Sequence, residues 1–225
     1  MLPWIPLATA TAPGGGALRL LRRGDEFSIR LSDGNELMNS RLGGSEEALA
    51  TLAMERLGER PAPHVLIGGL GMGFTLRAAQ SVAPPGARLV VSEIVPELID
   101  WAGAHMAAVF GECLADPRVR VETGDVRTAI REASGTYDAI LLDVDNGPDG
   151  LTRPENDALY ADKGLLATRR ALTAGGVLAV WSAAPDQAFS ARLARCGFSV
   201  STRTVRAGRT RRGGRHTIWL AEKAR

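Results

Sequence analysis

The sequence VLIGGLGMGF, residues 65–74, places four glycines directly after a short apolar run. The run is typical of a buried strand, and closely spaced glycines after it permit a tight turn that brings the backbone close to a ligand. Gly69, Gly71 and Gly73 follow the pattern GxGxG, whereas the dinucleotide pattern GxGxxG would need glycine where Phe74 stands. This stretch therefore predicts a strand, a cofactor-binding turn and the start of a helix.

Apolar, β-prone runs alternate with helical stretches from residue 64 onward. The expected parallel strands are HVLIGG (64–69), ARLVVSE (87–93), VRVETGD (119–125), YDAILLD (137–143) and GGVLAVWS (175–182). Alternation of this kind predicts an α/β fold with a sheet covered on both faces. The segments FSVSTRTVRA (198–207) and HTIWLAEK (216–223) predict a closing antiparallel hairpin.

The chain before this sheet is expected to have two parts. Residues 1–17 are interpreted as a flexible N-terminal arm. Residues 18–60 are interpreted as a small β-hairpin region with a lead-in helix over 44–60, whose start Ser45 can cap. Residues 61–225 then form the cofactor-binding α/β domain.

Composition excludes several classes of protein. The 225 residues carry a net charge of only +2, so no overall attraction to nucleic acid is expected, and the arginine-rich loop 203–215 is interpreted as a solvated tip. The two cysteines form no CxxC pair and no histidines have metal-ligand spacing, so no metal is predicted and a reducing cytoplasm is the expected setting. No apolar run is long enough to span a bilayer, and no membrane partner is expected.

Acidic residues follow the expected strands, where the carboxyl ends of parallel strands meet at one cleft. Glu93 can accept hydrogen bonds from both hydroxyls of a ribose. Asp125 can accept from an adenine amino group or cap the next helix, and both roles stay open. Asp143 and Asp145 can orient a nucleophile or accept its proton, although helix capping and a solvated loop are alternatives.

Several segments together resemble the spermidine synthase-like branch of the S-adenosylmethionine-dependent methyltransferase superfamily. They are VLIGGLGMGFTLRAA, VVSEIVPELIDWA, TGDVRTAI, YDAILLDVDNGP, ENDALY and the N-terminal stretch DEFSIRLSDGNELMNSRLGGSEEAL. The resemblance implies a Rossmann-like class I methyltransferase sheet of seven strands with a terminal antiparallel hairpin and a small N-terminal β-hairpin region. It also implies that Glu93 holds ribose and that Asp125 lies near adenine. Members of this family commonly form homodimers, whereas the sequence itself does not fix the oligomeric state.

The sequence departs from the aminopropyltransferases of that branch at three places. Their glycine loop carries an acid, which is missing here. Of their D-x-x-D sequence after the fourth strand, Asp143 matches the first acid and Asn146 replaces the second, and an amide does not take up a proton at neutral pH. Their tyrosine before the helix-start acids is replaced by Ser45, followed by Glu46 and Glu47.

These departures favour a methyltransferase that uses S-adenosylmethionine and acts on a small polar or cationic acceptor. Residues 138–157 hold six acids and one base, which favours a cation. Asp143 is expected at the methionine end of the cofactor, and the acceptor is expected near Glu47, Asp145, Asn146 and Tyr160, although Tyr160 can equally be a packed aromatic. The alternative is a polyamine aminopropyltransferase that uses decarboxylated S-adenosylmethionine. The second alternative is a nucleoside-binding protein without catalysis.

Overall fold

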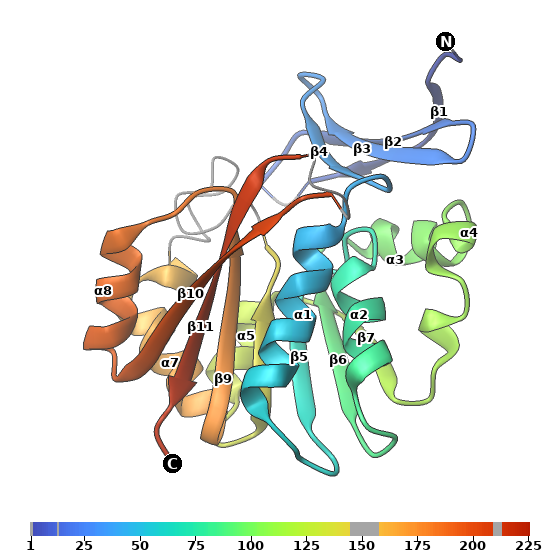
Figure 1. The fold of residues 1–225 in the computed structure, drawn as a ribbon. Helices are drawn as coiled ribbons and strands as arrows, with labels where there is room; N and C mark the ends of the chain where they lie inside the picture. Colours follow the sequence, from blue (N-terminus) through green and yellow to red (C-terminus); the bar gives the residue numbers. More distant parts are fainter. Residues whose placement is uncertain (1, 13, 145–157, 209–212) are drawn as a thin grey trace.

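The structure is a computed structural model that describes residues 2–12, 14–144, 158–208 and 213–225 (Figure 1). It contains a small antiparallel sheet that lies over one end of a larger α/β domain. The small sheet has four strands in chain order, β1 (Ile5–Thr11), β2 (Ala17–Arg23), β3 (Glu26–Leu31) and β4 (Glu36–Asn39). Asp145, Asn146 and the centre of the arginine-rich loop lie outside the described residues.

The larger sheet has seven strands in the order β10-β11-β9-β8-β5-β6-β7. Its strands are β5 (His64–Gly68), β6 (Arg88–Glu93), β7 (Val119–Thr123), β8 (Tyr137–Leu142), β9 (Leu172–Ser182), β10 (Phe198–Arg206) and β11 (Arg215–Lys223). Strands β7, β6, β5, β8 and β9 pair in parallel, and β11 and β10 form the antiparallel hairpin at the edge. The predicted fold class is therefore confirmed, and strand order reverses between β5 and β8, where ligands of such sheets bind.

Helices cover both faces of this sheet (Figure 1). They are α1 (Gly44–Leu57), α2 (Phe74–Val82), α3 (Pro96–Gly103), α4 (Ala107–Phe110), the 3-10 turn η1 (Cys113–Ala115), α5 (Val126–Glu132), α7 (Asp162–Ala171) and α8 (Gln187–Arg195). Because successive side chains of a strand point to opposite faces, Val65 and Ile67 pack with α1, α2 and α3, whereas Leu66 packs with α5, α7 and α8. Burial on both sides explains why the parallel strands read as continuous apolar runs.

The N-terminal region differs from its prediction. Residues 5–11, expected in a flexible arm, form β1, because pairing with β2 satisfies their backbone groups. The lead-in helix α1 packs on α2 and β9 and so belongs to the larger domain. Its N-cap is Gly43, not Ser45, whose hydroxyl is turned toward other side chains.

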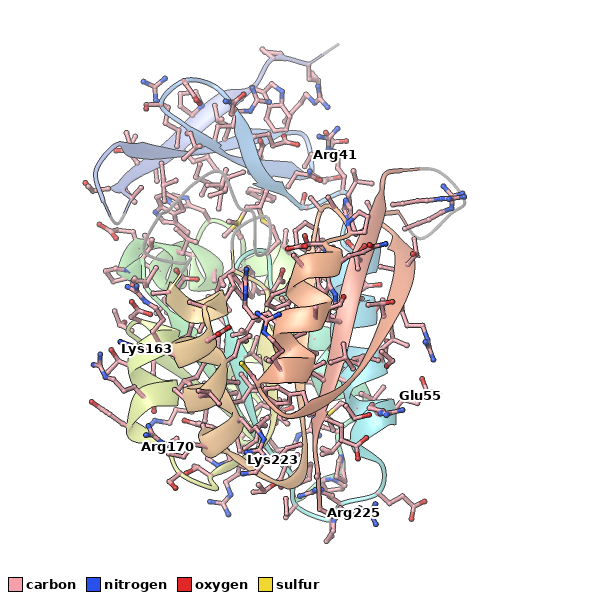
Figure 2. All side chains as sticks on the ribbon, turned by 90° about the vertical axis from the view of Figure 1, so that its left-hand side faces the viewer. Arg41, Glu55, Lys163, Arg170, Lys223 and Arg225 are labelled. Carbon is pink, nitrogen blue, oxygen red and sulfur yellow. The ribbon has the colours of Figure 1, made fainter. Side chains whose placement is uncertain are left out.

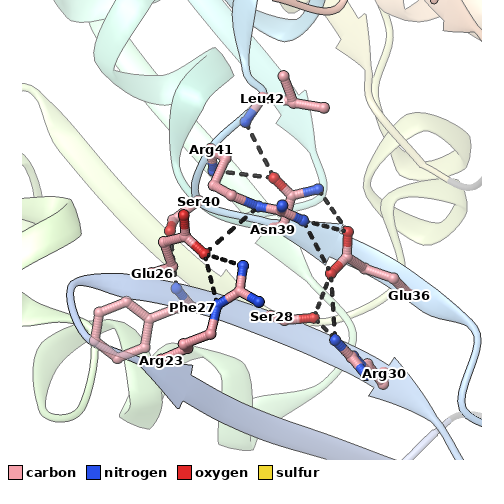
Figure 3. Close-up of polar contacts among 10 residues, drawn as sticks. All are labelled: Arg23, Glu26, Phe27, Ser28, Arg30, Glu36, Asn39, Ser40, Arg41 and Leu42. Atoms are coloured by element: carbon pink, nitrogen blue, oxygen red, sulfur yellow. Dashed lines mark hydrogen bonds and ion pairs between the residues drawn. The ribbon is translucent and has the colours of Figure 1, made fainter. Parts of the chain in front are cut away.

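Polar contacts fix the turn that joins the small sheet to α1 (Figure 3). The Glu36 carboxylate accepts hydrogen bonds from Ser28 Oγ at 2.7 Å, Asn39 Nδ2 at 2.9 Å and Arg41 Nη2 at 3.2 Å. Asn39 Oδ1 in turn accepts from the backbone N–H of Arg41 at 2.9 Å. These contacts tie β3, β4 and the following turn together, so the small sheet is held close to the start of α1. Figure 2 shows Arg41 beside this sheet and Lys223 and Arg225 at the opposite end of the molecule.

No helix among the described residues is long and apolar enough to cross a membrane.

Three aromatic rings pack in a row on the face of the larger sheet that α5, α7 and α8 cover. Phe189 is fully buried, with its ring edge-on to Tyr160 at 5.6 Å and to Trp219 at 5.0 Å. Phe189→Ala should lower the free energy of unfolding by about 3–5 kcal/mol, because it removes buried area and leaves a cavity. Urea denaturation measures this, with Leu166→Ala, 52% exposed on α7, as the control. Equal losses in both variants would contradict the packing described.

Candidate functional site

The glycine turn after β5 meets the end of β8. Gly69 has φ +90°, and a Cβ there would lie 2.7 Å from the carbonyl oxygen of Asp143, so only glycine fits. Gly73, the left-handed N-cap of α2, has φ +73°, and a Cβ there would lie 2.6 Å from the Phe110 ring. The sequence folds in this way because a backbone without side chains can pass between β8 and the helices.

A cavity of about 540 Å³ opens above this turn. Its floor is the glycine turn and the ends of β6, β7 and β8, and its other wall comes from the small N-terminal sheet. Gly69, Gly71, Glu93, Asp125 and Asp143 all line it, as the sequence predicts for cofactor-binding residues. Gly73 is the N-cap of α2 and is not among the described residues that line the cavity.

Glu93 is held by the backbone on either side of it. Its Oε2 accepts from the N–H of Leu70 at 2.8 Å, and its Oε1 accepts from the N–H of Val95 at 2.9 Å. Burial raises the pKa of this carboxyl, while those N–H groups oppose the rise. The backbone N–H groups of Ile94 and Gly71 also stabilise this carboxylate, and Glu93 lines the cavity.

Asp125 performs the capping role that was one of its two interpretations. Its Oδ1 accepts from the backbone N–H of Arg127 at 2.8 Å, at the start of α5. Its Oδ2 accepts from Arg127 Nε at 2.8 Å, which forms an ion pair. The adenine role stays a prediction, since the carboxyl also lines the cavity.

Asp143 and Glu46, here called the carboxyl pair, face the same cavity without a basic partner among the described residues. Asp143 Oδ2 accepts from Thr75 Oγ1 at 2.7 Å, and Glu46 Oε2 lies 2.6 Å from Ser45 Oγ. Burial, and then the negative charge of Glu46, raise the pKa of Asp143 to about 7. The pKa of Glu46 is also raised, first by its burial and, to a smaller degree, by the nearby Glu47. A carboxyl that titrates near neutral pH can take a proton from a bound ligand and release it again.

The described lining contains acids and no lysine, arginine or histidine. The acids are Asp33, Glu46, Glu93, Asp125 and Asp143. Arg127 offsets Asp125, and backbone N–H groups stabilise Glu93, so the unbalanced charge belongs to the carboxyl pair and to Asp33, whose hydrogen bonds among the described residues come from Asn35. Such a cavity attracts a cation. No cluster of three or more possible metal ligands occurs among the described residues.

Two predicted acceptor residues lie elsewhere. Glu47, one residue after Glu46, is outside the described lining, because a helix turns successive side chains by about 100°. Tyr160 is 1% exposed and packs against Phe189, with its hydroxyl 3.4 Å from the carbonyl oxygen of Val144, which favours the packed-aromatic alternative. For Asp145 and Asn146 the predicted roles stay predictions, since both lie outside the described residues.

Sequence reasoning missed three features of this site. Glu46 directly precedes the predicted Glu47 in the sequence, and the orientation of α1 decides which of the two side chains faces the cavity. Trp181, one residue before the end of β9, lines the cavity, and its buried indole N–H has no hydrogen-bond partner among the described residues. The small sheet forms a wall through residues of its turns and of the adjoining strands β2, β3 and β4, which carry no chemical signature in the sequence.

Sequence comparison places the chain near two aminopropyltransferases. No family model matches the chain. The polyamine aminopropyltransferase of Korarchaeum cryptofilum is 29% identical over 126 residues, which are 55% of this chain and 36% of that protein. The one of Nitrosomonas europaea is 33% identical over 100 residues, which are 44% of this chain and 29% of that protein. The matched segments thus span only about a third of the length of these curated relatives.

Structural comparison also finds similarity to spermidine synthases. The spermidine synthase of Thermotoga maritima superposes with a TM-score of 0.76 at 19% identity and covers 97% of this chain and 73% of its own. A spermidine synthase in complex with the transition-state analogue AdoDATO gives 0.75 at 18%, with 97% and 72% covered. A precorrin-6y C5,15-methyltransferase of Geobacter metallireducens gives 0.56 at 14%, with 78% and 87% covered. The chain has the spermidine synthase-like fold.

The resemblance to the spermidine synthase-like branch is confirmed by these findings. The prediction from the sequence that methyl transfer is favoured is wrong, because both curated relatives are aminopropyltransferases. The spermidine synthases also superpose better than the methyltransferase does. The acids missing from the family pattern suggested methyl transfer, whereas α1 supplies the cavity with a carboxyl, which is Glu46 and not the predicted Glu47.

The pKa of Asp143 makes the folded protein less stable as pH rises. The folded-state value is about 7, above the value of an unfolded aspartate, so ionisation within the fold costs stability between about pH 4 and pH 7. Asp143→Asn removes this cost and keeps an acceptor for Thr75. The melting temperature of the variant relative to the parent should therefore rise from pH 4 to pH 8. The control is Asp100→Asn, at an exposed position on α3, and a difference that does not change with pH would contradict the burial of an unpaired carboxyl.

Proposed function

We propose that the chain is an aminopropyltransferase, which moves the aminopropyl group of decarboxylated S-adenosylmethionine to a primary amine. The observation that carries the proposal is the unbalanced carboxyl pair in a cavity at the switch point of the sheet. The two curated relatives and the spermidine synthase structures support it. Methyl and aminopropyl transfer use the same nucleoside, so the fold alone leaves the transferred group open.

The nucleoside end of the donor fits the floor of the cavity. The carboxylate of Glu93, which lines the cavity, suits the ribose hydroxyls, and Asp125 with its apolar neighbours suits adenine. The glycine turn lets the backbone approach the ligand. A spermidine synthase with the same fold is solved in complex with the transition-state analogue AdoDATO, which supports a nucleoside donor for this fold.

The carboxyl pair suits an acceptor amine. A protonated amine offers N–H groups to both carboxylates. At neutral pH one of the carboxylates takes a proton from the amine, and the neutral amine that results is the nucleophile. The nitrogen then forms a bond to the carbon next to sulfur, while the carbon–sulfur bond breaks and its electron pair stays on sulfur as a neutral thioether. Asp143 replaces the proton acceptor that the family pattern would place at 146, since its pKa of about 7 suits that task.

Turnover with decarboxylated S-adenosylmethionine and a panel of diamines tests the proposal. Mass spectrometry should find the aminopropylated amine together with 5′-methylthioadenosine. The rate should rise with pH through about 7 as Asp143 loses its proton, and Asp143→Asn should lower kcat by about 100-fold while nucleoside binding is kept. Methylation of the amines from S-adenosylmethionine, or nucleoside binding without any turnover, would contradict the proposal.

The proposed ribose contact has its own test. Glu93→Ala should weaken binding of 5′-methylthioadenosine at least about tenfold, because two hydrogen bonds to a charged group are lost. Isothermal titration calorimetry measures the affinity, and circular dichroism checks the fold. The control is Glu132→Ala, at an exposed position on α5. Unchanged affinity would place the ribose elsewhere.

A further inference from the structure

A row of polar groups leads from the carboxyl pair toward the surface at the start of β11. Ser45 is fully buried, and its Oγ lies 2.6 Å from Glu46 Oε2 and 2.8 Å from His216 Nδ1. The other nitrogen of that imidazole faces exposed backbone, since a Cβ on Gly214 would lie 3.4 Å from Nε2. Glu46 itself lines the cavity. A continuous series of hydrogen-bonding groups therefore joins the cavity to the outside.

The direction of these hydrogen bonds depends on protonation, because a serine hydroxyl has one proton and can donate to one neighbour only. When Glu46 is a carboxylate, Ser45 donates to it and accepts from the Nδ1–H of His216. When Glu46 is a neutral acid, it donates to Ser45, and Ser45 donates to Nδ1 of an imidazole that carries its proton on Nε2. The two arrangements interconvert by moving protons along the row.

We propose that Ser45 and His216 form a proton-release path, which carries to solvent the proton that Asp143 takes from the acceptor amine and passes to Glu46 by way of the amine that contacts both carboxyls. The inference rests on the proposed function, because that reaction frees one proton inside the cavity in each turnover. Without a path, the proton would stay on the carboxyl pair, and the next amine would meet no free base. Ser45 and His216 are thus positioning residues that act through Glu46.

The step balances in protons. Glu46 holds the amine's proton as a neutral acid and passes it to Ser45 Oγ, while Ser45 passes its own proton to Nδ1 of His216. Nε2 then releases its proton to water, so one proton enters the row and one leaves, and Glu46 is a carboxylate again. The row resets when the imidazole ring turns toward solvent, gains a proton on Nε2, loses the Nδ1 proton to water and returns as the neutral Nε2–H form.

The surroundings of His216 suit a group that passes a proton without keeping it. Its neighbours are Ser45 from α1, the Trp181 ring from β9 with centroids 4.7 Å apart, and Val205 opposite it on β10. None of these is charged, and burial lowers the pKa of His216, so the imidazole is neutral at physiological pH. The charged groups near the inner end are Glu47 and Asp143, both acids, which favour a proton on Glu46.

Steady-state kinetics separate a release path from a merely structural contact. Ser45→Ala and His216→Ala should each lower kcat at least about tenfold, with the KM for the amine and the Kd for 5′-methylthioadenosine within about twofold of the parent. Added imidazole should restore His216→Ala but not Ser45→Ala, because only the first variant leaves space for it beside Ser45. The control is His105→Ala, an exposed histidine between α3 and α4. Unchanged kcat in His216→Ala would overturn the path.

A second measurement needs no turnover, so it stays decisive if the proposed function fails. Nitrogen-15 NMR should show that the pKa and the tautomer of His216 in the parent change in Glu46→Gln and in Ser45→Ala, while the His105 signal serves as the unchanged reference. A His216 signal that is identical in the parent and in both variants would overturn the path whatever the enzyme catalyses. Absence of amine transfer together with a coupled His216 would overturn the proposed function and leave the proton linkage standing.

Discussion

The backbone of Gly69 passes so close to the carbonyl oxygen of Asp143 that no side chain fits between them. This approach joins the end of β5 to the end of β8 at the point where strand order reverses. Because neither helices nor side chains can fill that point, a cavity remains there, and the residues that follow each strand face into it. Glu93, Asp125 and Asp143 all line this cavity. Widening the turn would separate the nucleoside floor from the carboxyl that follows β8.

The same constraint creates an electrostatic cost that the fold does not remove. Asp143 is held in a poorly hydrated position with Glu46 near it, and neither has a basic partner among the described residues. Elsewhere the chain pairs its acids closely, as with Asp116 and Arg118 at 2.7 Å or Asp125 and Arg127. Unpaired acids at one site destabilise the folded protein and are retained where a ligand supplies the missing charge. The carboxyl pair is therefore the part of the structure that most directly indicates a cationic ligand.

The small N-terminal sheet completes the site and also places α1. Its polar network around Glu36 holds the turn before α1, and the first turn of α1 carries Ser45 and Glu46. Glu46 thus reaches the cavity from outside the parallel sheet, and Ser45 meets His216 from the terminal hairpin. Segments from the beginning, middle and end of the chain are combined around one cavity, which couples the chemistry of the site to the packing of α1 on the sheet.

The sequence by itself determined the class of the fold, because a glycine turn after an apolar strand and the alternation of strands with helices are local patterns that packing reinforces. It also determined the acids at the strand ends, since parallel strands bring those ends together. Only the tertiary structure decided that Glu46 and not Glu47 faces the cavity, that Tyr160 is packed in the core, and that residues 5–11 form a strand. It alone joined Ser45 to His216, 171 positions apart in the chain. The physical reason is that these features depend on packing partners that a local sequence pattern does not specify. They are the rotation of a helix about its axis, the pairing of a strand at a sheet edge and the contacts between distant segments.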